Sequence, residues 1–226
     1  MTNFNIQTMF NYLAPRYDLF NKLTSLSLDG YWRKFAVSKS NECKNILDVC
    51  TGTGELAFEL ASKNEQRKIT GVDFSTEMLN IAKNKLNGEN IEFLLGNAEK
   101  LSFPEAAFDC VTSGFAMRNV INNIDIVLKE MYRVIKPKGK IIILEMSKPY
   151  SKFSRQLYYI YLRTVIYLLG LIIFGKRWPF RYLVNSIINF LEPEQFRKKL
   201  KDAGFEDIKY FPLTLGIVGI YTGVKR

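Results

Sequence analysis

The clearest candidates for chemistry are two aspartates around a glycine turn. Asp48 lies inside the apolar run NILDVC, and Gly52-x-Gly54 follows at the start of a predicted helix. Glycines allow a sharp turn and let a ligand approach the backbone closely. Asp73 ends the next predicted strand, 19 residues after Gly54, where a carboxylate can bind both hydroxyls of a ribose. The third glycine of a dinucleotide motif is replaced by Ala57, so the pattern favours a mononucleotide-like ligand.

A second group of candidates follows the third predicted strand. Asn97, Ala98 and Glu99 occupy a loop at the carboxyl edge of the predicted sheet, where an adenine would lie. The chain contains no histidine, which excludes Ser-His and Cys-His nucleophile pairs and an ordinary imidazole base. Its three cysteines have no CxxC spacing, so we expect no metal site and no disulfide scaffold.

Alternating strands and helices position these residues. The length of 226 residues fits one α/β domain, and strand-helix alternation predicts parallel pairing with right-handed crossovers. Ser75 is a predicted helix N-cap, and KPKG is a predicted break before the fifth strand. The two final strands have no helix between them and should pair antiparallel. The predicted strands are 45–50, 69–74, 91–96, 108–115, 140–146, 206–213 and 216–226.

Charge is concentrated in one region. The chain has 32 basic and 22 acidic residues, a net charge of +10, and no acid lies between residues 146 and 191. Seven basic residues fall in that interval: Lys148, Lys152, Arg155, Arg163, Lys176, Arg177 and Arg181. The N-terminus lacks the pattern of a secretory signal, so we expect a cytoplasmic protein. A net positive charge favours an anionic partner, which in the cytoplasm is either a nucleic acid or the cytoplasmic leaflet of the membrane.

The same interval holds the most apolar segment of the chain. Residues 164–175 are twelve uncharged residues between Arg163 and Lys176, whereas a membrane span needs about 20 apolar residues. An in-plane helix at the membrane surface and a helix that only covers the core, over residues 157–175, remain equal alternatives. Neither alternative is a span, and the location that we predict for the protein is the inner face of the cytoplasmic membrane.

Residues 45–146 resemble the class I S-adenosyl-L-methionine-dependent methyltransferases. The resemblance rests on Asp48, the glycine turn, Asp73 and the Asn97-Ala98 loop. It implies a Rossmann-like, mostly parallel seven-stranded sheet with the last strand antiparallel and helices on both faces. S-adenosyl-L-methionine is the implied cofactor. A related nucleotide-binding domain with another ligand is the alternative.

Further blocks resemble the ubiquinone/menaquinone biosynthesis C-methyltransferases over nearly the whole chain. These blocks are YDLFNKLTSLSLDGYW (17–32), FAMRNV (115–120), RVIKPKG (133–139), LEMSKP (144–149), RYLVNSI (181–187) and LTLGIVGIYTG (213–223). By this resemblance Thr53, Asp73, Asn97 and Ala98 match cofactor-binding positions. The serine that precedes the fourth-strand block in the family is replaced by Gly114, with Ser113 one residue earlier.

The chain departs from these patterns at four further positions. Cys50 stands at the first glycine of the general methyltransferase loop, where this family tolerates a small residue. Lys138 stands where the family has glycine, and Asp29 and Tyr221 stand where it has histidine. Asp29 and Tyr221 are therefore not carried over as catalytic residues.

The resemblance implies C-methylation of a polyprenylated hydroquinone, a demethylated menaquinol or ubiquinol precursor. We place the chemistry on Tyr17, Arg118 and Asn119 at the carboxyl edge of the sheet. Tyr17 and Asn119 would hold a water that takes the phenol proton, while Arg118 stabilises the phenolate. The alternative is that Arg118 pairs with Asp18 or another acid and only anchors the N-terminal segment.

The expected organisation is a single domain in four parts. They are an N-terminal helical lid (1–40), a cofactor-binding core (41–146), a basic apolar insertion facing substrate or membrane (147–191) and a C-terminal helix with a strand pair (192–226). A homodimer is left open.

Two alternative functions remain. One is methylation of another small lipophilic acceptor, and the other, which the sequence favours less, is an RNA methyltransferase or RNA-binding protein. Base methyltransferases have an (N/D)PPY-like motif where this chain has SGFAMRNV, so we expect no nucleic-acid partner.

Overall fold

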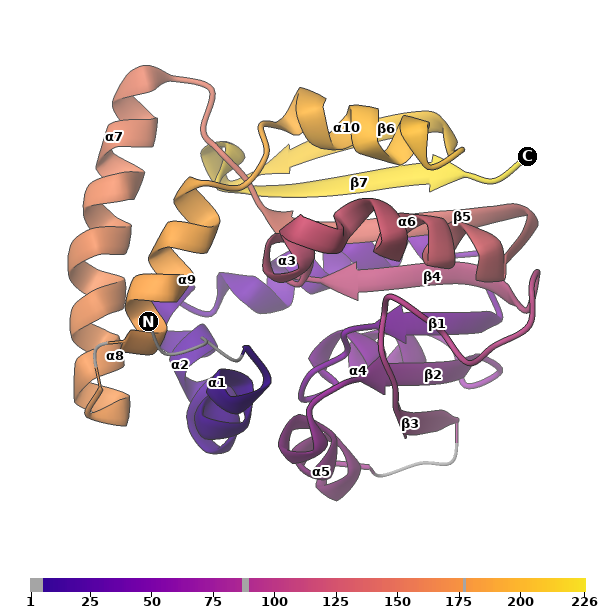
Figure 1. Ribbon diagram of the computed structural model, residues 1–226, viewed down its shortest axis with the longest axis horizontal. Coiled ribbons are helices and arrows are strands. Elements are labelled where there is room, and N and C mark those ends of the chain that lie inside the picture. Colours follow the sequence, from indigo (N-terminus) through magenta and orange to yellow (C-terminus); the bar gives the residue numbers. More distant parts are fainter. Residues whose placement is uncertain (1–5, 87–89, 177) are drawn as a thin grey trace.

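A twisted seven-stranded sheet organises the molecule in the computed structural model, which describes residues 6–86, 90–176 and 178–226 (Figure 1). The strands lie in the order β3-β2-β1-β4-β5-β7-β6. β1 to β5 are parallel, and β7 is antiparallel to both of its neighbours. The predicted sheet is therefore confirmed, including the antiparallel last pair. The strands are β1 Asn45–Val49, β2 Lys68–Asp73, β3 Ile91–Leu95, β4 Phe108–Gly114, β5 Ile135–Met146, β6 Glu206–Leu213 and β7 Val218–Val224.

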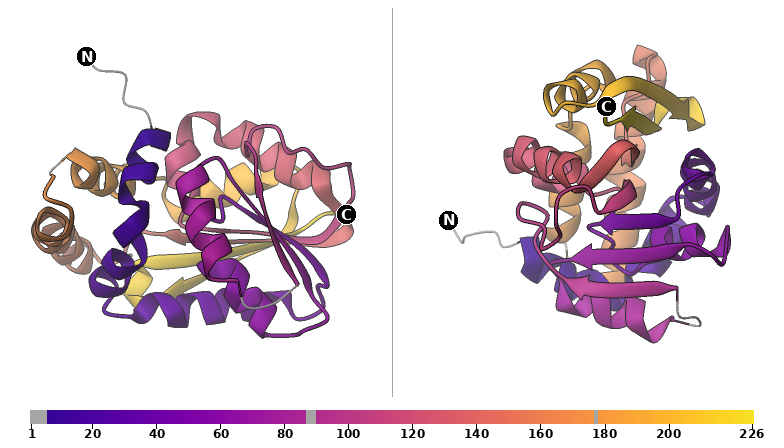
Figure 2. Two further views of the ribbon diagram at one scale, coloured as in Figure 1. Left: turned by 90° about the horizontal axis from the view of Figure 1, so that it is seen from below. Right: turned by 90° about the vertical axis from the view of Figure 1, so that its right-hand side faces the viewer.

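Helices cover both faces of the sheet because the strand side chains alternate between two apolar layers. Leu47 and Val111 pack with α6 (Ile124–Val134) and α10 (Pro193–Asp202) on one face. Ile46 and Ile142 pack with α3, α4 and α5 on the other face. These three helices are α3 Leu28–Val37, α4 Glu55–Ser62 and α5 Thr76–Asn84. The two views of Figure 2 show the sheet between these layers.

A third apolar cluster lies beyond the carboxyl ends of the parallel strands. It joins α1 (Ile6–Leu13) and α2 (Tyr17–Thr24) to a long helical rod and to α9 (Trp178–Ile188). The rod consists of α7 (Lys152–Tyr161), a π-helical turn (Leu162–Ile166) and α8 (Tyr167–Phe174). In Figure 1 the rod stands at the left edge of the molecule, on the side toward which the β1 and β4 arrows point. The N-terminal helices and the rod therefore face the edge of the sheet where open α/β folds bind their ligands.

Two local predictions can be compared with the structure. The Ser75 N-cap is confirmed, since its Oγ accepts a hydrogen bond from Met78 N at 3.2 Å. The predicted KPKG break is wrong, because these residues belong to β5 as an irregular stretch. The β4–β5 register pairs Phe108 with Ile135 and then Cys110 with Lys140, so the extra residues bulge without ending the strand.

Candidate active site

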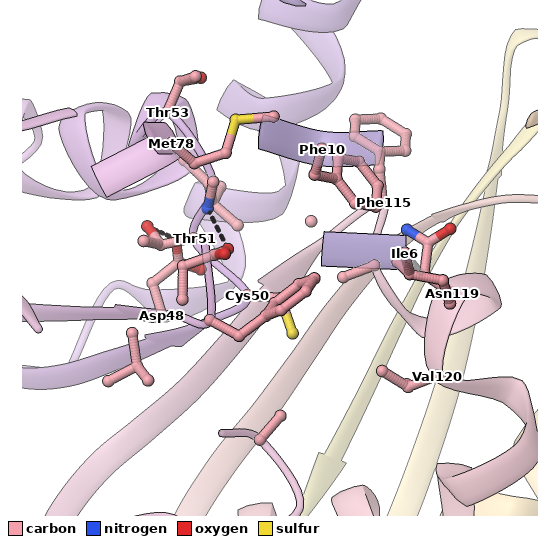
Figure 3. Close-up of a pocket in the computed structure, with 18 of the residues that line it drawn as sticks. Ile6, Phe10, Asp48, Cys50, Thr51, Thr53, Met78, Phe115, Asn119 and Val120 are labelled. Carbon is pink, nitrogen blue, oxygen red and sulfur yellow. Dashed lines mark hydrogen bonds between the residues drawn. The ribbon is translucent and has the colours of Figure 1, made fainter. Parts of the chain in front are cut away.

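The first cavity, about 570 Å³ in volume, lies at the carboxyl ends of β1, β2 and β4 under the N-terminal helices. Figure 3 shows Asp48, Thr51 and Thr53 on one side of it, with Phe10, Phe115 and Asn119 on the other. Most of the predicted cofactor residues line it: Asp48, Gly52, Thr53, Asp73, Asn97, Ala98 and Gly114. The topology thus gathers residues from four separate loops at one site.

Asp48 is buried at the end of β1 and held by two hydroxyls. Thr51 Oγ1 donates to Asp48 Oδ2 at 2.6 Å, and Thr112 Oγ1 donates to Oδ1 at 2.7 Å. Burial raises the pKa of Asp48 to about 6, although the two hydroxyl hydrogen bonds oppose that rise and the charge of Asp73 adds to it. The carboxylate is therefore fixed in place beside the cavity and destabilised in its charged form.

Asp73, at the end of β2, supports the glycine turn directly. Its Oδ2 accepts a hydrogen bond from Gly52 N at 2.8 Å and its Oδ1 accepts one from Ser75 N at 2.9 Å. Burial raises the pKa of Asp73, and the backbone donors counteract part of that effect. This carboxylate both shapes the turn and faces the cavity.

The turn between β1 and α4 uses left-handed backbone at three residues. Gly52 has φ +57° with nothing within 4 Å of where a Cβ would stand. Gly54 has φ +83°, and a Cβ there would meet Phe93 Cζ at 2.7 Å, so this glycine is required by packing rather than by a ligand. Cys50, which stands where the general methyltransferase loop has its first glycine, has φ +58°. This position is therefore left-handed although its residue carries a Cβ.

Two residues that we predicted to bind the cofactor are not on the cavity wall. Gly54 and Ser113 do not line the first cavity among the described residues. Ser113 is buried, and its Oγ donates to the Val49 carbonyl at 2.7 Å, joining β4 to β1. Asn97 lines the cavity while its Oδ1 accepts a hydrogen bond from Glu99 N at 2.9 Å, which fixes the loop after β3.

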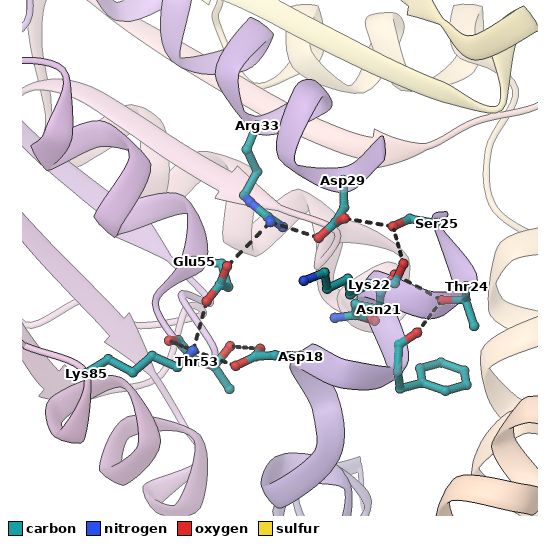
Figure 4. Close-up of polar contacts among 11 residues, drawn as sticks. Asp18, Asn21, Lys22, Thr24, Ser25, Asp29, Arg33, Thr53, Glu55 and Lys85 are labelled. Carbon is teal, nitrogen blue, oxygen red and sulfur yellow. Dashed lines mark hydrogen bonds and ion pairs between the residues drawn. The ribbon is translucent and has the colours of Figure 1, made fainter. Parts of the chain in front are cut away.

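A polar network ties the N-terminal helices to the turn (Figure 4). Thr53 Oγ1 donates to Asp18 Oδ1 at 2.6 Å, and Lys85 Nζ lies 2.5 Å from Asp18 Oδ2. Lys85 also contacts Glu55 at 2.9 Å, and Glu55 contacts Arg33 at 3.4 Å. Thr53, a predicted cofactor residue, is thus linked to the predicted lid.

Asp29 and Tyr221, where the family resemblance implies histidine, both have partners within the protein. Asp29 forms an ion pair with Arg33 at 2.8 Å and accepts a hydrogen bond from Ser25 Oγ at 2.7 Å. Tyr221 is buried, with its ring centroid 4.7 Å from that of Phe196. Tyr221 lines neither described cavity.

A second cavity of about 410 Å³ adjoins the first between the N-terminal helices and the rod. The two share four lining residues: Tyr17, Asn21, Arg33 and Phe115. Most of the second lining is apolar or aromatic, contributed by α2, α3, α7, α9 and the β6–β7 loop. Leu26 (78% exposed) and Leu215 (82% exposed) stand on its outer rim. The arrangement suits a ligand with an apolar body next to the occupant of the first cavity.

Arg118 lines the second cavity and forms a buried ion pair. Its Nη1 donates to Glu145 Oε1 at 2.8 Å and to the Phe115 carbonyl, and its backbone N donates to Glu145 Oε2 at 3.2 Å. Burial acts to lower the pKa of Arg118, but the charges of Glu145 and Tyr17 outweigh it and raise that pKa. Arg118 therefore pairs with Glu145, whereas Asp18 pairs with Lys85.

Tyr17 and Asn119 lie at the junction of the cavities. Tyr17 lines both, and burial raises the pKa of its hydroxyl despite the opposing charge of Arg118. Asn119 lines the first cavity, and its Oδ1 accepts a hydrogen bond from Tyr182 Oη at 3.3 Å. The structure thus brings Tyr17, Arg118 and Asn119 together around the shared wall.

Sequence reasoning missed two residues of the site. Glu145 is fully buried at the end of β5, and Tyr158 lines the second cavity from α7. An acid at the carboxyl end of a predicted strand is the signal that identified Asp73, and it applies equally to Glu145. Nothing in the sequence around Tyr158 distinguishes it from the neighbouring tyrosines.

Comparisons with known proteins agree with this geometry. A profile of the ubiE/COQ5 methyltransferase family matches residues 1–225. The chain is 40% identical over 227 residues to the ubiquinone/menaquinone biosynthesis C-methyltransferase of Geotalea daltonii, covering 97% of this chain and 96% of that protein. It is also 40% identical over 227 residues to the demethylmenaquinone methyltransferase of Chlorobaculum tepidum, covering 98% and 92%.

Solved structures are similar in fold. A SAM-dependent methyltransferase of Thermotoga maritima matches with a TM-score of 0.69 at 19% identity, covering 98% of this chain and 100% of that one. Human N-acetylserotonin methyltransferase in complex with SAM matches with a TM-score of 0.65 at 21% identity, covering 93% and 55%. Both place the sheet and its helices in the class I methyltransferase fold.

Proposed function

The chain belongs to the ubiE/COQ5 methyltransferase family, and we infer that it is an S-adenosyl-L-methionine-dependent C-methyltransferase of isoprenoid quinone biosynthesis. The relatives that carry these names match it over nearly their whole length. The observation that carries the acceptor is the apolar second cavity, which meets the first at Tyr17 and Phe115. The comparisons give no support to an RNA substrate or to another lipophilic acceptor.

The first cavity fits the cofactor by the chemistry of its lining. The space beside Gly52 admits a ligand against the backbone, and Asp73 presents a carboxylate for ribose hydroxyls. We assign adenine to the loop of Asn97 and Ala98, and the cationic methionine end to the region of Asp48 and Thr53. Bound S-adenosyl-L-methionine supplies an electrophilic methyl group on a sulfonium.

The cofactor assignment is tested by replacing Asp73. A hydrogen bond to a charged group contributes about 1.5–3 kcal/mol, so Asp73→Ala should weaken cofactor affinity by roughly 10–150-fold. Isothermal titration calorimetry with S-adenosyl-L-methionine measures this, and Asp125→Ala, an exposed acid on α6, is the control. An unchanged dissociation constant in Asp73→Ala would reject the assignment.

The acceptor ring lies, in this proposal, at the wall shared by the two cavities. Aromatic C-methylation needs a ring carbon held in line with the methyl group and phenolate character on an adjacent oxygen. Tyr17 and Asn119 hold the water that takes the phenol proton. Arg118, protonated and buried, stabilises the negative charge that develops on the ring.

The acceptor assignment is tested with short-tailed quinols. The purified protein, given labelled S-adenosyl-L-methionine, should transfer methyl to demethylmenaquinol or to a demethylated ubiquinol precursor under anaerobic conditions. Running both rings side by side decides which ring system it prefers. Absence of transfer to either quinol, with transfer to another lipophilic phenol or amine, would reject the quinol assignment.

We propose further that the protein works at the inner face of the cytoplasmic membrane. Among the described residues, one helix, Lys152–Phe174, is long and apolar enough to cross a membrane, yet only 22% of its most apolar window is buried. One side of this rod packs Tyr158, Leu162 and Ile166 against the third cluster. The other side is apolar and exposed: Phe153, Leu157, Ile160, Leu168 and Ile172. We call these five residues the rod stripe.

An in-plane position accounts for both sides of the rod better than a span does. The buried side already contacts the protein, and Arg163 lies near the middle of the rod. Basic residues of this region attract anionic lipid by about 1 kcal/mol each. Arg177, one of the predicted basic residues, lies outside the described residues. Leu157 of the stripe lines the second cavity together with the two rim leucines, and in this proposal a polyprenyl tail enters the cavity there from the lipid.

Vesicle flotation tests the membrane proposal. Phe153→Asp with Ile172→Asp, both about three-quarters exposed, should abolish binding to anionic vesicles. Ile126→Asp, at an exposed position on the outer side of α6, is the matched control and should bind to vesicles like the parent. Alkaline carbonate should release the bound protein, whereas a spanning helix would resist it. Normal flotation of the double variant, with a change from dimer to monomer, would show instead that a second copy covers the stripe.

A further inference from the structure

Two polar atoms of the second cavity have no partner. Among the described residues, four buried side-chain atoms lack a hydrogen bond: Arg67 Nε, Arg118 Nε, Tyr158 Oη and Arg197 Nε. Of these residues only Arg118 and Tyr158 line the second cavity. Buried polar groups are nearly always paired, so two orphans at one cavity indicate that a ligand pairs them.

Tyr158 is a buried residue on the wall of the second cavity. It lies on the inward side of α7, is 5% exposed and belongs to the third apolar cluster with Leu162. The charges of Arg118 and Glu145 act on its hydroxyl, which places all three groups in one electrostatic neighbourhood. Tyr161, one turn further on, differs because its Oη donates to the Thr24 carbonyl at 2.6 Å.

The chemistry of the two orphans restricts what they can bind. A guanidinium Nε–H only donates, and burial raises the pKa of the Tyr158 hydroxyl, which keeps its proton for donation. Two donors that line the same cavity can be paired by an acceptor with two lone pairs and, beside Arg118, by one that tolerates negative charge. A quinol oxygen that becomes a phenolate has both properties.

We propose that Tyr158 Oη donates a hydrogen bond to the ring oxygen next to the methylated carbon and thereby binds the quinol as its phenolate. The proposal rests on the acceptor function given above and adds a residue to it. A donor on the phenolate lowers the pKa of the bound quinol, because it favours the charged form. The ring carbon then carries the electron density that attack on the methyl group requires.

Tyr158→Phe tests this assignment because it removes only the hydroxyl. A hydrogen bond to a charged oxygen corresponds to about a 10–100-fold effect, so kcat with a short-tailed demethylated quinol should fall by about that factor. The acid limb of the kcat–pH profile should move to higher pH by about 1–2 units, because the bound phenolate loses a donor. Binding of the same quinol to the protein without cofactor should weaken at pH 8, as calorimetry can measure.

A stability measurement separates this role from a structural one. The hydroxyl has no partner, so Tyr158→Phe should melt at the same temperature as the parent or higher, with cofactor affinity unchanged. Tyr159→Phe, the same substitution one residue on and outside both cavities, is the matched control for activity and pH profile.

Each result decides between the two proposals. Unchanged kcat, or a lowered kcat with an unmoved acid limb, would overturn the assignment of Tyr158 to the phenolate oxygen. A parent protein that methylates no quinol at all would instead overturn the acceptor function itself.

Discussion

Asp48 and Asp73 line the first cavity from neighbouring strands, but only Asp48 has its oxygens fixed by two hydroxyls. With a pKa of about 6, Asp48 binds a proton in the folded protein that it would lose near pH 4 when unfolded. Between these values the unliganded protein therefore becomes less stable as pH rises. A cation bound beside Asp48 reverses this penalty by favouring the carboxylate.

Cofactor affinity should consequently depend on pH through Asp48. Below about pH 6 the carboxylate must first lose its proton, so the dissociation constant should rise by up to about tenfold per pH unit. Titration calorimetry from pH 7.5 to 5 measures the trend, and Asp48→Asn should flatten it. A dissociation constant that stays level across this range in the parent would contradict the placement of the cationic end at Asp48.

Arg118 cannot be tested by a simple alanine substitution, because its partner would remain buried and charged. Breaking a buried ion pair costs about 3–5 kcal/mol, so Arg118→Ala should unfold more readily as well as lose activity. The double variant Arg118→Met with Glu145→Gln should keep most of the stability and still lose about 10²-fold or more in kcat. Thermal melts and single-turnover assays measure the two effects. Normal turnover by a stable double variant would leave Arg118 as an anchor only.

At the scale of elements, a residue with a side chain takes a left-handed backbone where the family resemblance implies a glycine. Lys138, in the bulge of β5, has φ +65°, and its N donates to the Lys225 carbonyl at 2.6 Å. A left-handed residue with a Cβ costs about 1–2 kcal/mol, and glycine costs about 0.5–1 kcal/mol in unfolded-chain entropy. Lys138 therefore holds backbone strain, which the rest of the folded protein offsets.

Lys138→Gly should stabilise the protein. The difference between the two terms is about 0.5–1 kcal/mol, which corresponds to an increase in melting temperature of about 1–4 °C. Lys138 is exposed, so few contacts are lost. Lys138→Ala, which keeps the positive φ, should show no such increase. An equal or lower melting temperature in Lys138→Gly would show that the bulge is not strained.

How far the sequence predicts these elements depends on whether the signal is local. Strand-helix alternation, the Ser75 cap and the Gly52-x-Gly54 turn are local, and each identified its element. The bulge at KPKG was missed because β4 pairs with β5 across a register shift, which only the folded sheet sets. Tyr158 was missed for the same reason, since its role depends on α7 turning it toward Arg118 across 40 residues of chain.

At the scale of the whole molecule, our membrane proposal predicts that the rod stripe and the rim leucines turn the second cavity toward lipid. A long-tailed quinol in anionic vesicles should therefore be methylated at a rate that falls with added salt, since lipid attraction is screened. A short-tailed quinol in solution should show little salt dependence. Parallel assays from 50 to about 500 mM salt compare the two. Equal salt dependence for both substrates would argue against delivery from the membrane.

The contacts of Asp18 with Thr53 and Lys85 bear on the order of events in turnover. α1 and α2 form one wall of the first cavity, and we predict that the spent cofactor leaves when these helices move away from the turn. On that prediction, opening of the N-terminal helices limits steady turnover, and the first methyl transfer is faster than the later ones. Rapid mixing should show a burst of methylated product of about one equivalent per enzyme. Asp18→Asn, which weakens the contacts of Asp18 with Thr53 and Lys85, should reduce that burst and speed the later turnovers. Product formation that is linear from the first turnover in the parent would instead show that the chemical step is the slow one.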